Sequence, residues 1–227
     1  MIILQLQESR RPAVSQVRVI SNTELVPNTF VLRTERTSES LIAGQCFSIG
    51  TRDLAINREY SIYSGIQEKY FEFLIRRVDE GAVSQKLCSL SPDSEVEIWG
   101  PYGSFVIDET KIDNHEFIFI ATGTGIAPFN SFVRSFPNLN YKILHGIRFE
   151  EEVYPSGHYK PESYLSCISQ AKSEKKRNRV TDILQEMDYY ENQIFYLCGN
   201  QFMISDGIAI LRQNGINGSR IYTETFF

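Results

Sequence analysis

Short apolar runs separated by turn residues dominate the first half of the chain. Runs of this kind, recurring about every ten to twenty residues, predict β-strands. One helical segment, Ser84–Leu90, interrupts them, and Pro101–Phe105 closes the region. The pattern predicts an antiparallel barrel. Its expected strands are Val14–Ile20, Thr29–Arg36, Gln45–Gly50, Arg58–Ser64, Tyr70–Arg77 and Glu95–Gly100.

The second half has a different rhythm, which begins after the polar connector Asp108–Glu116. Strands and helices alternate there, and this predicts a parallel sheet with helices on both faces. We therefore expect a barrel domain over residues 1–109 and an α/β domain over residues 110–227. The expected strands are Phe117–Thr122, Tyr141–Gly146, Tyr164–Ser169, Ile194–Cys198 and Arg220–Thr223, and the expected helices are Pro128–Ser135, Val180–Met187 and Gln201–Gln213.

Composition narrows the class of protein. The 227 residues are 42% hydrophobic and 22% charged, which is ordinary for a globular protein. No run approaches the roughly 20 apolar residues of a membrane-spanning helix. The net charge of −5 argues against nucleic acid as a main partner. Because Met1–Gln7 is too short and too polar for a signal peptide, we expect a cytoplasmic protein.

The cysteines and histidines are too dispersed to predict a metal site. No CxxC pair or iron–sulfur cluster motif occurs among Cys46, Cys88, Cys167 and Cys198. The histidines His115, His145 and His158 show no ligand spacing either. We expect the cysteines to be free, buried thiols.

The run Phe117–Phe129, FIFIATGTGIAPF, joins an apolar strand to a glycine turn and a helix. Glycines let backbone N–H groups approach a diphosphate, and the helix N-terminus adds a favourable dipole. The same turn is common in purely structural roles, so alone it leaves both interpretations open.

Arg58–Ser64 is a second segment with groups suited to a ligand. Alternate residues of a strand share a face, which separates Arg58, Tyr60, Ile62 and Ser64 from Glu59, Ser61 and Tyr63. A guanidinium suits a phosphate, a phenol offers a stacking surface, and a hydroxyl can hydrogen-bond a ring atom. A surface ion pair with packed neighbours is the alternative.

Three further segments carry candidate chemistry. Gly81–Ser84 opens the single helix of the first half; we expect Ser84 as its N-cap, with free N–H groups that suit a pyrophosphate or serve capping alone. Tyr196–Asn200, YLCGN, is a strand that ends in glycine. Ile221–Phe227 ends the chain on two phenylalanines, which predicts either a final core strand or an aromatic lid over a planar cofactor.

In their order and spacing, these segments resemble the ferredoxin–NADP(H) reductase family of flavoproteins over nearly the whole chain. RxYS at Arg58–Ser61 is similar to the flavin motif of that family, and GTGIAPF to its nucleotide-phosphate turn. YLCGN resembles its nicotinamide-side strand, and the ending Glu-x-aromatic its C-terminal signature. The chain looks like a compact member with a single flavin.

The resemblance implies roles on the flavin side. Arg58 would grip the flavin phosphate, Tyr60 would stack on the ring, and Ser61 would hydrogen-bond near N5. A pyrophosphate site favours FAD over FMN, and the residues implied to hold it are Gly81, Ala82, Val83 and Ser84.

The resemblance also implies roles on the nucleotide side. Cys198 would lie beside the nicotinamide, although a packing thiol is the alternative. Glu224 matches an acid near the flavin edge and completes the expected catalytic set of Ser61, Cys198 and Glu224. Phe226, followed by Phe227, matches the aromatic residue that covers the nicotinamide face. The dinucleotide phosphates would lie against Thr122, Gly123, Thr124 and Gly125.

The choice between NADPH and NADH depends on cationic groups for a 2′-phosphate. Bacterial members of the family supply three arginines. Arg148 and Arg179 match two of them, whereas Gln170 stands where the third is usual. Lys172 or Lys175 would have to compensate. We favour NADPH, with NADH as the alternative.

The resemblance therefore implies an FAD-dependent oxidoreductase that accepts hydride from NAD(P)H and passes single electrons to a small acidic redox protein, such as ferredoxin or flavodoxin. The alternatives are the reductase component of an oxygenase or other multi-subunit enzyme, and a non-catalytic flavin- or nucleotide-binding regulatory module. An acidic partner needs a basic surface, for which the candidates are Arg10, Arg11, Arg18, Arg33 and Arg36.

Overall fold

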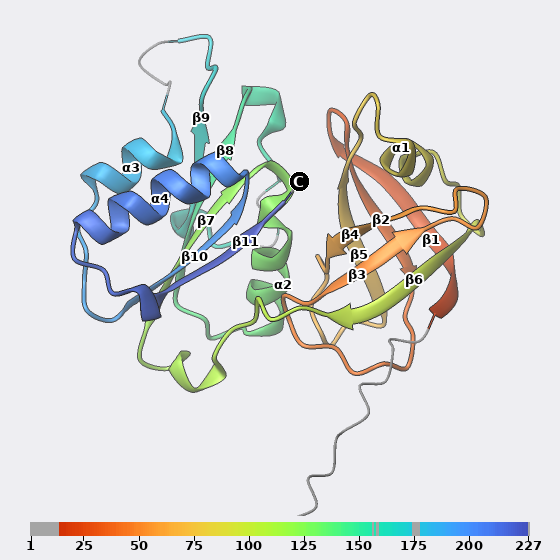
Figure 1. Ribbon diagram of the computed structural model, residues 1–227, viewed down its shortest axis with the longest axis horizontal. Coiled ribbons are helices and arrows are strands. Elements are labelled where there is room, and N and C mark those ends of the chain that lie inside the picture. The colour runs from red at the N-terminus through yellow and green to blue at the C-terminus, as the bar shows by residue number, and fades with distance from the viewer. Residues whose placement is uncertain (1–13, 156, 158, 174–177, 227) are drawn as a thin grey trace, which may run out of the picture.

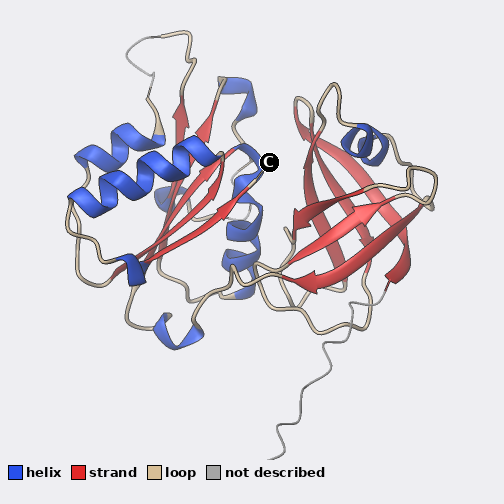
Figure 2. Ribbon diagram, in the orientation of Figure 1, coloured by secondary structure: helices blue, strands red, loops and turns tan. Residues whose placement is uncertain are grey.

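Two β-sheets stand side by side in the computed structural model (Figure 1). The structure describes residues 14–155, 157, 159–173 and 178–226. The first sheet is antiparallel and the second is parallel, with most of the helices on the second (Figure 2). The predicted architecture of a barrel followed by an α/β domain is confirmed.

Six strands in the order β4-β3-β6-β1-β2-β5 form the first sheet. A bridge between Ile62 and Phe73 joins the two outer strands and closes the barrel. Phe47, Phe71 and Phe73 pack edge to face or tilted at its centre. The elements are β1 (Val14–Val26), β2 (Thr29–Glu35), β3 (Cys46–Gly50), β4 (Asn57–Ser61), β5 (Tyr70–Arg76), α1 (Ala82–Cys88) and β6 (Glu95–Tyr102).

The strand expected over Arg58–Ser64 is shorter than predicted. β4 ends at Ser61, and the next three residues are all buried, so the predicted alternation of faces stops there. Tertiary contact explains the difference, because Ile62 turns into the barrel core to pair with Phe73.

Five parallel strands in the order β11-β10-β7-β8-β9 form the second sheet. α3 and α4 cover one face, and α2 lies on the face towards the barrel (Figure 1). The elements are β7 (Glu116–Thr122), α2 (Ala127–Ser135), β8 (Tyr141–Ile147), β9 (Tyr164–Ile168), α3 (Val180–Glu186), β10 (Gln193–Gly199), α4 (Gln201–Gln213) and β11 (Ile221–Thr225), with short 3₁₀ turns η1 (Glu109–Lys111), η2 (Gly123–Ile126) and η3 (Glu150–Glu152).

The central strand β7 is apolar throughout because both of its faces are covered. Phe117 and Phe119 pack towards α2, whereas Ile118 and Ile120 pack towards α3 and α4. The domain boundary near residue 110 stays a prediction. It falls in η1, between the two sheets. In the described part of the chain, no helix is long and apolar enough to cross a membrane.

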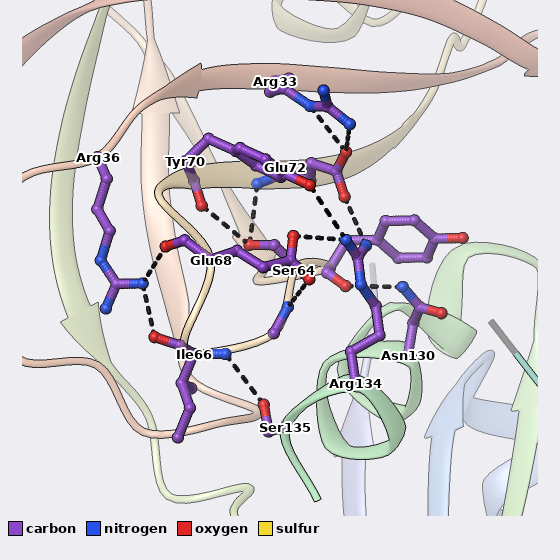
Figure 3. Close-up of polar contacts among 12 residues, drawn as sticks. Arg33, Arg36, Ser64, Ile66, Glu68, Tyr70, Glu72, Asn130, Arg134 and Ser135 are labelled. Carbon is purple, nitrogen blue, oxygen red and sulfur yellow. Dashed lines mark hydrogen bonds and ion pairs between the residues drawn. The ribbon is translucent and has the colours of Figure 1, made fainter. Parts of the chain in front are cut away.

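The two domains share one packed and hydrogen-bonded boundary. Apolar residues of the barrel, among them Tyr63 and Leu74, belong to the same buried cluster as Phe129 and Phe132 of α2. At its edge, Arg134 of α2 pairs with two carboxylates of the barrel, Glu68 and Glu72 (Figure 3). We call Arg33, Glu68, Glu72 and Arg134 the boundary ion cluster.

Candidate functional site

The carboxyl ends of three neighbouring parallel strands meet at one edge of the second sheet, where α/β proteins commonly bind ligands. β10 lies between β7 and β11, and its Cys198 is in register with Glu224 of β11. The barrel supplies Ser61, whose hydroxyl donates to Glu224 Oε2 at 3.2 Å across a separation of 163 residues. The thiol of Cys198 lies 3.9 Å from the same oxygen. The structure thus brings the three predicted catalytic residues together.

Burial changes the acidity of this group of residues. Removal from water raises the pKa of Glu224 to about 7, with a smaller contribution from the Glu59 carboxylate, while the Ser61 hydroxyl opposes the rise. Burial, together with the nearby Glu224 carboxyl, raises the pKa of the Cys198 thiol well above its usual range. Cys198 is therefore a neutral thiol at neutral pH, and Glu224 is close to half protonated.

The glycine turn carries two different kinds of glycine. A Cβ on Gly125 would lie 2.3 Å from the Cys198 carbonyl oxygen, so this glycine permits close packing of the turn on β10. Gly123 has a φ of +53°, and a Cβ there would meet nothing within 4 Å. Its outer side is therefore open to a ligand. The turn continues as η2, and helix α2 begins only at Ala127.

Thr122 closes the turn from the other side. Its hydroxyl oxygen accepts the Asn200 N–H at 2.8 Å. A Cβ on Gly199 would lie 2.3 Å from that same oxygen, and Gly199 has a φ of +128°, so β7 and β10 fit together closely at this edge. Thr122 therefore holds the two strand ends together, whereas Gly123 and Thr124, both half-buried, continue the turn beyond them.

On the barrel, Arg58 and Tyr60 occupy β4 beside Ser61. Arg58 is exposed, and its Nη1 donates to the Asn57 carbonyl at 2.9 Å. Tyr60 is half-buried against the barrel core, and burial raises the pKa of its phenol, which stays neutral. Ser61 is 4% exposed. The exposed fraction therefore decreases along β4 from Arg58, which is exposed, through Tyr60, which is half-buried, to Ser61, which is buried and contacts Glu224.

The prediction that Ser84 is an N-cap is wrong. Helix α1 starts at Ala82 with Gly81 in the N-cap position, so Ser84 is the third helical residue. Its hydroxyl accepts the Val78 N–H at 3.1 Å and donates to the Gly81 carbonyl at 3.0 Å. The hydroxyl is thus used within the loop, and the groups free for a phosphate are the first backbone N–H groups of α1, at Ala82 and Val83.

The C-terminal segment forms β11, an edge strand of the parallel sheet whose residues are half-buried or exposed, so it is a strand but not the core strand of the first alternative. Tyr222 of β11 stacks on Tyr196 of β10 with ring centroids 4.6 Å apart. Phe226 is half-buried, and its N–H donates to the Gly199 carbonyl at 2.9 Å. β11 runs towards the seam between the domains (Figure 1). Phe227 lies outside the described residues.

Two arginines expected to select the nucleotide stand at exposed positions. Arg148 follows β8 directly, and Arg179 directly precedes α3. Lys172 pairs with Glu151 at 3.3 Å, and Lys175 lies outside the described residues. Glu152 belongs to no motif and was not predicted. Its carboxylate accepts the Arg148 N–H at 2.8 Å and pairs with Arg76 of the barrel at 2.9 Å, which fixes the backbone that carries Arg148.

The arginines expected to form a basic docking surface have partners within the molecule. Arg18 pairs with Glu35, and Arg33 pairs with the buried Glu72. Arg36 donates to two backbone carbonyls, both shown in Figure 3. The remaining candidates, Arg10 and Arg11, lie outside the described residues. The described part of the chain therefore gives no support to this basic surface.

Comparison with known proteins identifies both domains. Residues 14–107 match the family model of the oxidoreductase FAD-binding domain, and residues 119–207 match that of the oxidoreductase NAD-binding domain. The chain belongs to the ferredoxin–NADP reductase family of flavoproteins. It therefore contains the FAD-binding barrel and the NAD-binding domain of a flavin-dependent oxidoreductase.

The similar proteins have names that describe different kinds of redox protein. The chain is 28% identical over 203 residues to the phenol hydroxylase P5 protein of Acinetobacter pittii, covering 81% of this chain but 57% of that protein. It is 27% identical over 191 residues to the flavodoxin/ferredoxin–NADP reductase of Buchnera aphidicola, covering 74% of each. A ferredoxin NADP+ reductase from Neisseria gonorrhoeae with bound FAD and NADP has the same fold, with a TM-score of 0.83 at 18% identity over 94% of this chain and 99% of that one.

Proposed function

We propose that this chain is an FAD-dependent reductase that accepts hydride from NADPH and passes single electrons to a small redox protein. The observation that carries the proposal is the meeting of Ser61, Cys198 and Glu224 beside an open glycine turn. Hydride transfer requires two flat rings held in contact more than it requires a nucleophile. A neutral thiol from the second sheet and a hydroxyl from the barrel, both next to the Glu224 carboxyl, suit that task.

The residues present fit the two cofactors. Gly123 is open on its outer side, where a bulkier residue would stand between the turn and a diphosphate. Exposed Arg58 and the first N–H groups of α1 provide positive charge and donors for the phosphates of FAD. The half-buried ring of Tyr60 offers a surface on which a flavin can stack. Bound FAD would supply an acceptor that takes electrons in pairs and releases them singly.

The chain itself would orient the rings and hold a proton. Ser61 donates its hydroxyl hydrogen to Glu224, which fixes the carboxyl at the boundary between the domains. Since the pKa of Glu224 is raised to about 7, this carboxyl both binds and releases a proton near neutral pH. Cys198 would stay a neutral thiol on the side of the site where the nicotinamide would be held. Phe226, whose N–H donates to the Gly199 carbonyl, would move its ring aside when the nicotinamide docks.

Arginine chemistry supports NADPH over NADH. Arg148 and Arg179 are both exposed near the ends of strands that flank the nucleotide side, where a guanidinium can bind a 2′-phosphate with two hydrogen bonds. The names of two relatives, from Buchnera aphidicola and Neisseria gonorrhoeae, also specify NADP.

The proposed acceptor is a ferredoxin or flavodoxin. The Buchnera aphidicola relative carries both in its name and matches equal shares of the two chains. An oxygenase component is the second candidate, because the match to the phenol hydroxylase P5 protein covers more of this chain. In either case the acceptor would approach the seam between the domains, where the predicted flavin edge lies.

An absorbance spectrum of the purified protein tests the proposal. The protein should show flavin bands, and anaerobic NADPH should bleach them faster than NADH does. Stopped-flow traces with each nucleotide would give the preference, and ferredoxin, flavodoxin and an oxygenase component would then be compared as acceptors. A protein that binds no FAD, or whose FAD stays oxidised with both nucleotides, would contradict the proposed function.

A further inference from the structure

His145 is fully buried in β8, and neither the sequence motifs nor the proposed chemistry assigns it a role. Its Nε2 lies 2.9 Å from the carbonyl oxygen of Gly123, and its Nδ1 lies 2.8 Å from the hydroxyl of Tyr164. The ring of Tyr154 packs against it edge to face at 4.8 Å. The imidazole thus connects the interior of the second domain to the glycine turn.

These contacts fix the arrangement of hydrogens. A carbonyl oxygen only accepts, so Nε2 must carry the hydrogen and donate it to Gly123. Burial lowers the pKa of His145 to about 4, so the ring is neutral at neutral pH. Nδ1 is then an acceptor, and the Tyr164 hydroxyl donates to it. The neutral ring satisfies both partners with a single tautomer.

The hydrogen bond to Gly123 also orients the next peptide N–H. In a trans peptide, the carbonyl of residue 123 and the N–H of Thr124 point in opposite directions. Because His145 holds the carbonyl towards the interior, the Thr124 N–H points away from it, towards the open side of the turn. As the second residue of η2, Thr124 has no acceptor for its N–H within that turn.

The position needs such a restraint because Gly123 is a glycine in the left-handed region. Its φ of +53° is accessible at low cost, but so are many other backbone conformations. No side chain limits them. A buried donor on the carbonyl is therefore the restraint that selects one conformation.

We propose that His145, supported by Tyr164, is a positioning residue that aims the Thr124 N–H at the diphosphate of the pyridine nucleotide. Tyr164 is itself held, since Tyr159 stacks on it with rings 5.2 Å apart and 3° from parallel. The proposal rests on the proposed function, because it assumes that the turn binds a dinucleotide. It adds that the geometry of the turn is set from inside the domain.

Two substitutions separate the hydrogen bond from the packing. His145→Phe keeps a ring of similar size but removes the donor, and His145→Gln places an amide N–H near the position of Nε2. We expect His145→Phe to raise the KM for NADPH and the calorimetric Kd for NADP+ about tenfold, because the Gly123 carbonyl then loses the donor that fixes the turn. His145→Gln should restore most of the affinity. Bound FAD and kcat should change much less than KM.

A hydride donor without phosphates provides the control. With 1-benzyl-1,4-dihydronicotinamide in place of NADPH, the loss caused by His145→Phe should be about tenfold smaller, since nothing then occupies the turn. Equal losses with both donors, no loss with either, or no recovery in His145→Gln would overturn the proposal. A wild-type protein that neither donor reduces would instead contradict the proposed function.

Two further measurements test the proposal if His145→Phe fails to fold: an NMR spectrum of the histidine ring nitrogens, and NADP+ binding by Tyr164→Phe. In ¹⁵N-labelled protein, the resonances of His145, assigned by their loss in His145→Gln, should show hydrogen on Nε2 alone. Tyr164→Phe should leave this hydrogen in place and raise the Kd for NADP+ by less than the tenfold expected for loss of the donor, relative to the wild type. A spectrum with hydrogen on Nδ1 would overturn the assignment and the proposal with it.

Discussion

Glu224 is a carboxyl group whose pKa in the folded protein, about 7, lies above its ordinary 4.5. Between these two values the folded state keeps a proton that the unfolded state has released. The free energy of unfolding therefore falls as the pH rises through this window, and the shift corresponds to about 3 kcal/mol in total. Above about pH 7 the folded state carries the whole free-energy cost of the ionised, buried Glu224 carboxylate.

Glu224→Gln should remove this dependence while keeping the size and a polar partner for Ser61. Urea unfolding of the flavin-free protein from about pH 5 to pH 8 would measure it, and the variant should be the more stable protein at the upper end. Glu186→Gln, at an exposed position of α3, is the matched control and should keep the wild-type slope. A Glu224→Gln slope equal to that of the wild type would show that the carboxyl is not protonated in the fold.

The two glycines of the turn make a second residue-scale prediction. Gly125→Ala forces a Cβ to within 2.3 Å of the Cys198 carbonyl oxygen. Because the backbone fixes the positions of both atoms, the turn η2 and β10 must move apart. We expect a loss of about 2–3 kcal/mol in the free energy of unfolding. Gly123→Ala meets no atom and bears only the cost of its positive φ, about 1 kcal/mol. Denaturant unfolding of both would test the order; the reverse order would refute this division of roles.

At the scale of elements, the boundary ion cluster attaches α2 to the barrel. Arg134 has 11% of its side chain exposed and pairs with Glu72, which has 5% exposed. Removing Arg134 would leave the Glu68 carboxylate without its ion-pair partner and the buried Glu72 carboxylate with Arg33 alone. Arg134→Met should therefore lower the free energy of unfolding by about 3 kcal/mol, as measured in urea.

Arg18→Met is the control for that substitution. Arg18 also pairs with a glutamate, but 61% of its side chain is exposed, so water replaces the lost partner. Its stability should stay close to that of the wild type. If the two variants lost equal stability, burial would not be the property that makes the Arg134 pair important.

Strand and helix positions were predictable wherever the local pattern decides them, as in β7, where an apolar run is covered on both faces. The end of β4 was not, because it depends on the contact of Ile62 with Phe73 on a distant strand. The N-cap at Gly81 was missed because Ser84 uses its hydroxyl on Val78 within the preceding loop.

The roles of the candidate site residues were predicted from a family resemblance and not from the local sequence pattern alone. Ser61 and Glu224 were paired through a family resemblance, since no local pattern relates residues 163 apart. Glu152 and the Arg134 pairs carry no motif and become visible only when the two domains are placed together. His145 precedes a recognised position, Arg148, by three residues, but its role depends on which atoms its two nitrogens contact.

For the whole molecule, the shared apolar cluster predicts that the two domains unfold together. Tyr63 and Leu74 of the barrel pack in the same cluster as Phe129 and Phe132 of α2, so neither domain keeps its full core alone. Calorimetry should show one transition whose calorimetric and van't Hoff enthalpies agree. Added FAD should move that single transition upwards. Two separate peaks in the wild type would show that the domains are independent.

The exposed placement of Arg148 and Arg179 has a consequence for how such a protein changes over time. Neither guanidinium is part of the packed interior, whereas Gly125, Cys198 and His145 are locked into it. Substitutions at the two arginines can thus accumulate without a folding penalty. Under the proposed function, the preference between the two nucleotides is therefore open to change by engineering at the surface, whereas a change in the turn would disturb the packed interior.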